Sequence, residues 1–485
     1  MRYELVMGLE VHIEMATQSK LFCTCSAAFG ADPNENVCPA CSGMPGLLPV
    51  LNKKAVELAI TAGLVTNCHI NPRSLFDKKN YYYPDLPTSY QITQFYAPIC
   101  TDGHIDISTD VTGGENNNVA GTTKTIRIKQ IHIEEDAGKL LHTPNTGQSL
   151  IDYNRAGVPL IEIVSQPDFR SAEEALAYLE KLRSILRCAG VSDCKMEEGS
   201  MRADINISIR EPGATTLGTR TEIKNMNSLR AIARAITYEY RRHVDALEQG
   251  TEELVQETRR WDDLQNRSFA MRTKENATDY LYFPNPDIPP LDISDEWIAD
   301  LRAALPEMPD VKKARYMADY ALSEYDSALI AVNKDLANLF EETCALHSEP
   351  KEIANWIIGE LLALMKKDEA DNATRIDAPR LAQLIKMVAG GSVNRLNAKK
   401  IFAAMYWENA DPAAYSEKHN LLNESDDALI KQVVSDVISA NAKSVEDYRS
   451  GKIKAKDFLF GQAMRTLCGN GDPGTIKRLL DEALS

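Results

Sequence analysis

The feature that most constrains the fold is a set of strand-like segments in the first 230 residues, each with apolar side chains on one face and polar ones on the other. In MGLEVHIEM, three aliphatic residues alternate with three ionisable ones, namely Leu9, Val11 and Ile13 with Glu10, His12 and Glu14. Because successive strand side chains point to opposite faces, this pattern predicts a strand with one face in a core. The chain therefore requires a sheet whose other face bears acids.

Three further segments repeat this alternation. ADINISIR sets three isoleucines against Asp204, Asn206 and Ser208, and TRTEIKN places Arg220, Glu222 and Lys224 on one face. Acids on a sheet face must be neutralised by a metal or solvated. Oxygen ligands with an occasional imidazole suit Mg²⁺ and Mn²⁺.

In the third segment, TIRIKQIHIEED, the apolar phase slips between Ile128 and Ile131. Such a slip predicts a β-bulge at Lys129 and Gln130. The segment ends in three acids, Glu134, Glu135 and Asp136.

Length and composition predict a globular protein of several domains. At 485 residues the chain is long enough for two to four domains, each with its own core. The net charge of -16 argues against a general nucleic-acid binder, although it permits a local basic surface. The sequence has no apolar run near the ~20 residues that span a bilayer and no signal-like N-terminus, so we expect a cytoplasmic protein without a membrane partner.

The patterns along the chain predict an α+β protein in three parts. Strands alternate with loops up to residue 292. A helix is expected over 171–189, with Ser171 as its cap, and another over 228–249, with Leu247 among its inward residues. Four prolines in residues 283–292 predict a boundary, after which the periodicity is helical. A second boundary is expected near 408–420. The predicted domains are 1–292, a helical domain at 293–410 and a helical tail at 411–485.

Four cysteines cluster in the loop 22–46 with the spacing of a zinc site: Cys23, Cys25, Cys38 and Cys41. Two short turns can bring four thiolates together tetrahedrally, and four protein ligands leave no open position for chemistry. Free buried thiols and redox chemistry are the alternatives. A zinc-deaminase arrangement, with His12 and Glu14 joined to Cys38 and Cys41, is a further alternative, but Val37 stands where that signature has proline.

The acids of the strands are candidates for a site that binds a divalent metal and nucleotide phosphate: Glu10, His12, Glu134, Glu135, Asp204 and Glu222. Any one of them is also explained by a solvated strand face. Lys224 lies two residues from Glu222, where it can pair with phosphate, and Arg155 is a phosphate clamp or a salt-bridge partner. The sequence has no Walker-A motif, and GxGxxG at 469–474 follows a helical pattern, which favours a plain turn.

Two segments suggest contact with nucleic acid. Residues 76–94 place Lys78 and Lys79 before three tyrosines, which suits base stacking as well as core packing. In the tail, three basic residues precede an apolar helix and favour RNA contact or a solvated surface, namely Lys452, Lys454 and Lys456.

The order of these motifs resembles the family of B subunits of aspartyl/glutamyl-tRNA amidotransferases. The resemblance covers essentially the whole chain and includes GLEVHIEM, VCPACSGMPGLLPVLN, FDKKNYYYPDLP, IHIEEDAGK, DYNRAGVPLIEIVS, ADINISI, TEIKNMNS, NWIIGELL and GKIKAKDFLFGQAMR. It implies a glutamine-synthetase-like cradle domain, a helical domain and a tail that contacts tRNA. It also implies two protein partners, a glutamine amidase (the A subunit) and a small C subunit, and the mischarged substrates Glu-tRNA(Gln) and Asp-tRNA(Asn).

The resemblance further implies a two-step reaction in which ATP, with Mg²⁺, phosphorylates the side-chain carboxylate and ammonia then displaces phosphate. It assigns the metal pocket to the six residues named above, with Glu10, His12, Glu135, Asp204 and Glu222 taking part in catalysis. It associates Lys79 with the ammonia passage and the four cysteines with the zinc that some members hold. The alternative is a scaffold that binds RNA without catalysis, while its partner performs all chemistry.

Overall fold

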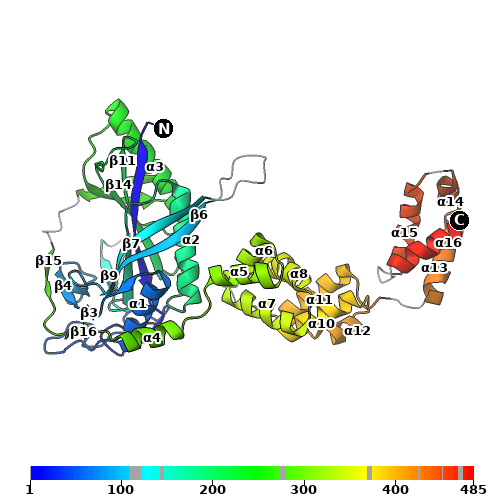
Figure 1. Ribbon diagram of the computed structural model, residues 1–485, viewed down its shortest axis with the longest axis horizontal. Coiled ribbons are helices and arrows are strands. Elements are labelled where there is room, and N and C mark those ends of the chain that lie inside the picture. The colour runs from blue at the N-terminus through cyan, green and yellow to red at the C-terminus, as the bar shows by residue number, and fades with distance from the viewer. Residues whose placement is uncertain are drawn as a thin grey trace. The chain divides into compact units, whose positions relative to one another are not determined.

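The computed structural model divides the chain into two compact units, Met1–Met308 and Pro309–Ser485 (Figure 1). The structure describes residues 2–109, 122–142, 147–273, 280–368, 374–423, 427–450, 452–467 and 473–484. The predicted turn at 469–474 lies mostly outside the described residues. Each unit is described by itself below.

The first unit is built on a nine-stranded sheet in which β1 (Glu4–Glu14) is central. Every strand pairing in this sheet is antiparallel except the parallel pairing of β12 with β13. The order is β14 (Arg267–Thr273), β13 (Glu257–Asp262), β12 (Thr221–Lys224), β11 (Met201–Arg210), β1, β10 (Pro159–Ser165), β7 (Thr122–Glu135), β6 (Cys100–Thr109) and β2 (His69–Ile70).

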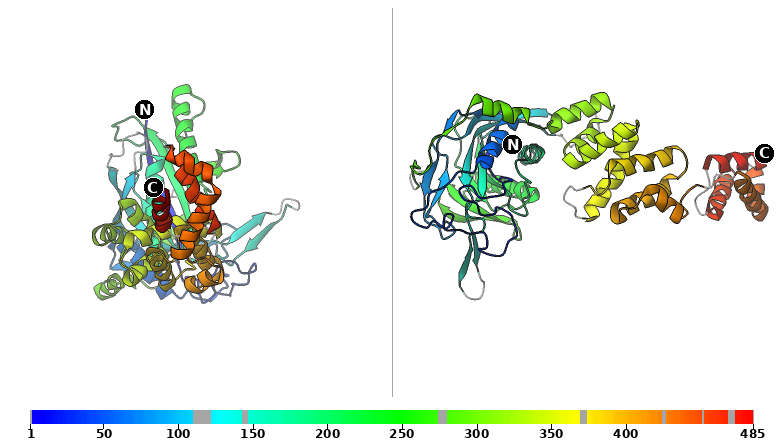
Figure 2. Two further views of the ribbon diagram at one scale, coloured as in Figure 1. Left: turned by 90° about the vertical axis from the view of Figure 1, so that its right-hand side faces the viewer. Right: turned by 90° about the horizontal axis from the view of Figure 1, so that it is seen from below.

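One face of this sheet packs on helices α1 (Lys53–Val65), α2 (Ala172–Cys188) and α3 (Leu229–Gln249) (Figures 1 and 2). The predicted alternation is confirmed, because Leu9, Val11 and Ile13 are buried in the core with the isoleucines of β11. The acids therefore lie on the opposite face. There they meet a small sheet of β15 (Leu281–Pro284), β4 (Asp77–Asn80) and β5 (Tyr90–Thr93).

The predicted bulge in β7 is confirmed. Gln130 pairs with Val164 and Ile128 with Ser165, so Lys129 is the extra residue. The bulge restores the phase of the strand, and both Ile128 and Ile131 are buried.

The two helices expected in this unit begin at the predicted residues. Ser171 accepts a hydrogen bond from the backbone of Glu174, and Ser228 accepts one from Ala231. Gly250 ends α3 in the left-handed conformation, with φ 64°. One detail was wrong: Leu247, expected to point inward, is exposed, because the buried stripe passes through Ala246 and the next residue is turned by about 100°.

The proline-rich segment 283–292 forms short edge strands in the first unit. β15 pairs with β4, and β16 (Leu291–Asp292) pairs with β3 (Arg73–Ser74). Helix α4 (Asp295–Ala303) then packs Trp297 and Ile298 against the same core. A further hairpin joins β8 (Lys139–His142) to β9 (Ser149–Asp152). The limits of the three predicted domains remain a prediction.

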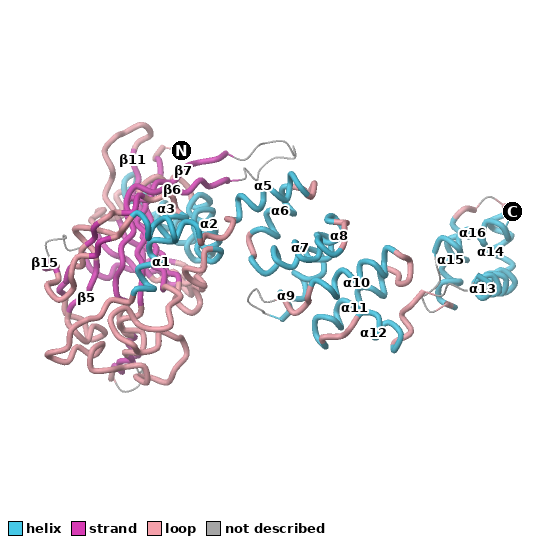
Figure 3. Tube along the Cα trace, turned by 60° about the horizontal axis from the view of Figure 1, so that its bottom comes forward, coloured by secondary structure: helices cyan, strands magenta, loops and turns pink. Residues whose placement is uncertain are grey.

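In the second unit every element among the described residues is helical (Figure 3). One core, which includes Trp356 and Phe402, unites α5 (Pro309–Asp319), α6 (Glu324–Ala331), α7 (Lys334–Leu346), α8 (Pro350–Asn355), the π-helix η2 (Trp356–Leu361), α9 (Leu362–Asp368), α10 (Ala378–Ala389), α11 (Arg395–Glu408) and α12 (Pro412–Lys418). A separate core unites α13 (Asp427–Ala440), α14 (Ala442–Arg449), α15 (Lys454–Thr466) and α16 (Pro473–Leu484).

The α+β class is confirmed, whereas the glutamine-synthetase-like cradle remains a prediction. Among the helices that the structure describes, none has both the length and the apolar composition needed to cross a membrane.

Candidate metal and phosphate site

The polar face of the large sheet carries a group of three residues that we call the histidine cluster: His12, Glu134 and Glu162. They come from the adjacent strands β1, β7 and β10, where His12 is paired with Glu162. His12 Nε2 lies 3.8 Å from Glu134 Oε1 and 3.7 Å from Glu162 Oε2. An imidazole nitrogen and two carboxylates thus face one another.

His132 supports this cluster from β7. Its Nε2 lies 2.9 Å from Glu162 Oε2 and 3.6 Å from Glu134 Oε2. Burial acts to lower the pKa of His132, but the two carboxylates outweigh it and raise the pKa to about 10. Burial likewise acts to raise the pKa of Glu162, and the charge and hydrogen bond of His132 hold it well below its ordinary value.

A second group on the same face, which we call the lysine cluster, contains Glu10, Asp204 and Glu222 together with Lys224. Glu10 lies directly opposite Asp204 in the β1–β11 pairing. Lys224 Nζ donates to Asp204 Oδ2 at 2.5 Å and lies 3.2 Å from Glu222 Oε1. Burial acts to lower the pKa of Lys224, but Asp204 and Glu222 raise it above its usual value. Burial, with the charges of Glu162 and Glu222, raises the pKa of Glu10.

Neutral side chains orient the carboxylates of both clusters. Asn206 Nδ2 donates to Glu10 Oε1 at 2.8 Å, and Thr258 Oγ1 donates to Glu222 Oε2 at 2.8 Å. Thr93 of the small sheet donates to Glu134 Oε2 at 3.4 Å. The first two hydrogen bonds come from neighbouring strands, so strand register fixes the directions of Glu10 and Glu222.

Both clusters fit a hard divalent cation. Magnesium holds oxygen ligands at about 2.1 Å, so its ligands lie at most about 4.2 Å apart. One ligand atom from each of the three members lies within 4.8 Å of the others in each cluster. Small side-chain movements therefore bring the ligand atoms of either cluster to the spacing that magnesium requires.

Glu135, predicted for the same pocket, lies elsewhere. Because neighbouring strand residues face opposite sides, its carboxylate accepts the Ile92 N–H at 3.1 Å and lines a cavity of about 220 Å³ beside Lys20, Cys23 and Cys41. Burial raises the pKa of Glu135 to about 7.

Conversely, sequence reasoning did not place Glu162 and His132 among the metal-site candidates. The alternation of each strand could have identified them. His132 and Glu134 are two residues apart and share the polar face of β7, and Glu162 is the acid on the polar face of β10.

Arg155 and Lys79, both predicted to act on the substrate or on ammonia, contact other parts of the protein. Arg155 donates to the carbonyls of Ala137 and Gly138 at 2.9 and 3.0 Å, and its Nε lies 3.6 Å from Asp136 Oδ2, which is the contact that the salt-bridge alternative requires. Lys79, on β4, lies over the rings of Tyr81 and Tyr280. Burial acts to lower the pKa of Lys79, but Tyr282 and the carboxylate of Glu134 raise it above its usual value.

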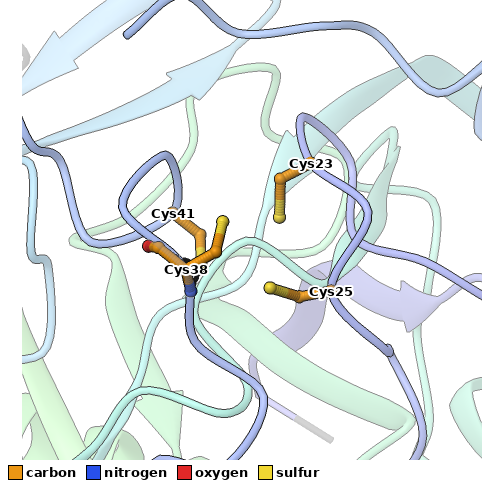
Figure 4. A group of neighbouring side chains, drawn as sticks. All are labelled: Cys23, Cys25, Cys38 and Cys41. Carbon is orange, nitrogen blue, oxygen red and sulfur yellow. Dashed lines mark hydrogen bonds between the residues drawn. The ribbon is translucent and has the colours of Figure 1, made fainter.

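The four cysteines of the loop converge as predicted (Figure 4). Their sulfur atoms lie within 4.8 Å of one another, against a separation of about 3.8 Å around a tetrahedral zinc with 2.3 Å bonds. The Cys38 N–H donates to Cys41 Sγ at 3.2 Å, and Lys20 Nζ lies 3.7 Å from the same sulfur. A hydrogen bond from Cys23 lowers the pKa of Cys41 to about 4. The deaminase alternative was wrong, because His12 groups with carboxylates.

The three tail lysines lie at the start of α15. Lys452 Nζ lies 2.8 Å from Asp447, and Lys456 pairs with Asp481. Lys454 is exposed at the first position of the helix.

Comparison with known proteins identifies both parts of the chain. Residues 5–299 match the family model described as the GatB/GatE catalytic domain, and residues 338–484 match the GatB domain. The chain is 51% identical over 484 residues to the B subunit of the aspartyl/glutamyl-tRNA(Asn/Gln) amidotransferase of Lachnoclostridium phytofermentans, covering 100% of this chain and 99% of that protein. It is 50% identical over 489 residues to the protein of the same name from Lachnospira eligens, covering 99% of each.

Proposed function

The chain belongs to the family of aspartyl/glutamyl-tRNA(Asn/Gln) amidotransferase B subunits, and from that premise we propose that it is an ATP-dependent ligase acting on mischarged tRNA. Its substrate is Glu-tRNA(Gln), Asp-tRNA(Asn) or both. The side-chain carboxylate attacks the γ-phosphorus of ATP, the bond to the β–γ bridging oxygen breaks, ADP leaves, and the carboxylate becomes an acyl phosphate. Ammonia then attacks the carbonyl carbon, the C–O bond to phosphate breaks, and the amide forms with loss of a proton and inorganic phosphate.

The observation that carries this proposal is the presence of two acid clusters side by side on one sheet face. Both include a residue of β1, where Glu10 and His12 are two positions apart on the same face. His12, Glu134 and Glu162 would hold one Mg²⁺ ion, and Glu10, Asp204 and Glu222 would hold another. Bound Mg²⁺ neutralises the charge that develops on phosphate oxygens during phosphoryl transfer.

The chain's own residues supply the rest of the chemistry. His132 keeps Glu162 ionised and oriented toward His12. Lys224 brings a positive charge to the phosphate side of the site. Lys79, a half-buried cation over the rings of Tyr81 and Tyr280, interacts electrostatically with Glu134, and we place the arrival of ammonia there.

The remaining assignments follow the family. The cysteine cluster would hold a structural Zn²⁺ that fixes the loop 22–46. Ammonia would come from a glutamine amidase, the A subunit, and a small C subunit would complete the heterotrimer, while tail lysines would contact the tRNA body. We therefore propose that the protein acts in translation in the cytoplasm.

The test is amidation by the reconstituted heterotrimer with ATP, glutamine and each mischarged tRNA. Asp204→Asn and Glu134→Gln should each lower the rate of amide formation by about a hundredfold or more, while tRNA binding persists. The matched control is Asp106→Asn on β6, where the exposed carboxylate accepts from Thr125 away from both clusters. Wild-type amidation by both variants at saturating Mg²⁺ would contradict the proposal.

The alternative function is a scaffold that binds RNA without catalysis. Deletion of the tail from residue 411 distinguishes the enzyme from the scaffold. An enzyme that has lost its tail should bind tRNA more weakly but still phosphorylate bound substrate slowly. A scaffold should show no nucleotide turnover that depends on Asp204 or Glu134.

A further inference from the structure

The two acid clusters are neutralised in different ways. In the lysine cluster the ammonium group of Lys224 lies between carboxylates, 2.5 Å from Asp204 Oδ2 and 3.2 Å from Glu222 Oε1. In the histidine cluster, the groups within ion-pair distance of Glu134 and Glu162 among the described residues are the imidazoles of His12 and His132.

This difference matters for metal binding. The imidazole of His12 can turn a lone pair toward a metal and become a ligand, whereas an ammonium group has three donors and no acceptor. Lys224 therefore cannot share the lysine cluster with a dication as a ligand. It competes with the dication for the same oxygens of Asp204 and Glu222.

The charges and the strand register of the lysine cluster favour a cation bound among its carboxylates. Glu10 and Asp204 lie directly opposite each other on β1 and β11, and Asn206 lies opposite Glu222 on β12. Carboxylates placed opposite each other repel, so the cluster without a cation is unfavourable. Lys224 reduces the formal charge of the three carboxylates from -3 to -2.

Lys224 is also able to leave. It is the last residue of β12, and Asn225 follows it in the left-handed conformation, with φ 70°. Its side chain is 38% exposed although its partners Asp204 and Glu222 are 15% and 8% exposed. The four-carbon stem can therefore swing the ammonium group toward solvent without unpacking the core.

We propose that Lys224 is a tethered cation that occupies the lysine cluster in the resting enzyme, and that a dication enters this cluster only by displacing it. The proposal rests on the metal-dependent function proposed above. The histidine cluster accordingly binds its dication without nucleotide. The lysine cluster takes one together with ATP, because the triphosphate provides a new anionic partner for the displaced ammonium group.

The test is Mn²⁺ binding to the complete heterotrimer, with free Mn²⁺ measured by electron paramagnetic resonance in the absence of nucleotide. Wild type should bind one ion tightly and a second weakly. Lys224→Met keeps the stem but removes the charge, and should tighten the second site by about tenfold or more. Lys224→Arg, which keeps the charge, should behave like wild type.

Two controls assign the ions. Lys124→Met removes another lysine that is ion-paired, 2.7 Å from Glu174, and its position on β7 is about 33 Å along the strand from Glu134; it should leave both sites unchanged. Glu134→Gln should remove the tight ion. Retention of that tight ion by Lys224→Met shows that the variant is folded, and Lys224→Gln serves as a second neutral variant.

A non-hydrolysable ATP analogue provides an independent arm. It should tighten the second site of wild type by a larger factor than that of Lys224→Met, whose site no longer has a cation to displace.

Equal second-site affinity in wild type and both neutral variants would overturn the tethered-cation proposal and leave the metal-dependent function standing. Absence of bound Mn²⁺ from wild type and all variants would overturn both.

Discussion

Replacement of His132 by glutamine should destabilise the metal-free protein by an amount that depends on pH. His132 is buried at 8% exposure, with its Nε2 2.9 Å from Glu162, and the two carboxylates raise its pKa from 6.5 to about 10 against the effect of burial. One pKa unit corresponds to about 1.4 kcal/mol, so this difference sets an upper limit of about 5 kcal/mol. Removing one partner of a buried pair typically costs about 3–5 kcal/mol.

Glutamine retains an N–H donor but not the charge, so we expect a loss of about 2–4 kcal/mol in the free energy of unfolding at pH 7. The folded-state pKa of His132 lies above its unfolded value. The stabilisation is therefore fully present below pH 6.5 and is lost as the pH rises through about 10. The difference between wild type and His132→Gln should shrink toward zero at pH 10.5.

The assay is urea unfolding in EDTA at pH 7 and pH 10.5, followed by the fluorescence of buried Trp261 in the first unit. The matched control is His69→Gln on β2, where the histidine is exposed. A loss below about 1 kcal/mol at pH 7, or an equal loss at both pH values, would refute the reasoning about this ion pair.

Three further predictions concern other parts of the chain. Cys38→Ser should abolish stoichiometric zinc in purified protein and lower its melting temperature; an unchanged metal content by mass spectrometry would contradict the zinc assignment. Burial, with the neighbouring Asp136, raises the pKa of Glu14 to about 8. Wild type should therefore lose stability as the pH rises from 4.5 through 8, while Glu14→Gln should not. Parallel pH profiles of the free energy of unfolding in urea would contradict this prediction. Replacement of Lys452, Lys454 and Lys456 by glutamine should reduce the salt dependence of tRNA binding, by about one unit in the slope of log affinity against log salt for each phosphate contact that is lost. An unchanged slope would show that these lysines do not contact the tRNA.

Local features of the fold were predictable because they depend on neighbouring residues. Alternation along β1 placed Leu9 in the core and Glu10 on the polar face, and the phase slip located the bulge at Lys129. Cap residues such as Ser171 fixed the start of a helix. Leu247 was misplaced because the buried stripe passes through Ala246, from which Leu247 is turned by about 100°, and only the packed structure selects Ala246.

Long-range register decided what the sequence could not. The single acid of β10, Glu162, becomes part of a cluster only because β10 pairs with β1 at His12 and with β7 at His132. Glu135 is an acid at the end of β7, as Glu134 is, yet strand alternation turns its side chain away from Glu134 and toward the cysteine loop. Residues far apart in the sequence meet through strand pairings, and the register of these pairings cannot be read from a single sequence.

The most direct measurement is anomalous X-ray diffraction from crystals of the heterotrimer grown without nucleotide and soaked in Mn²⁺. A manganese peak should lie between His12 Nε2 and the carboxylates of Glu134 and Glu162. If the map shows no manganese there, or places the ion on Glu135 instead, the claim that this sheet face is the metal centre for amidation is contradicted.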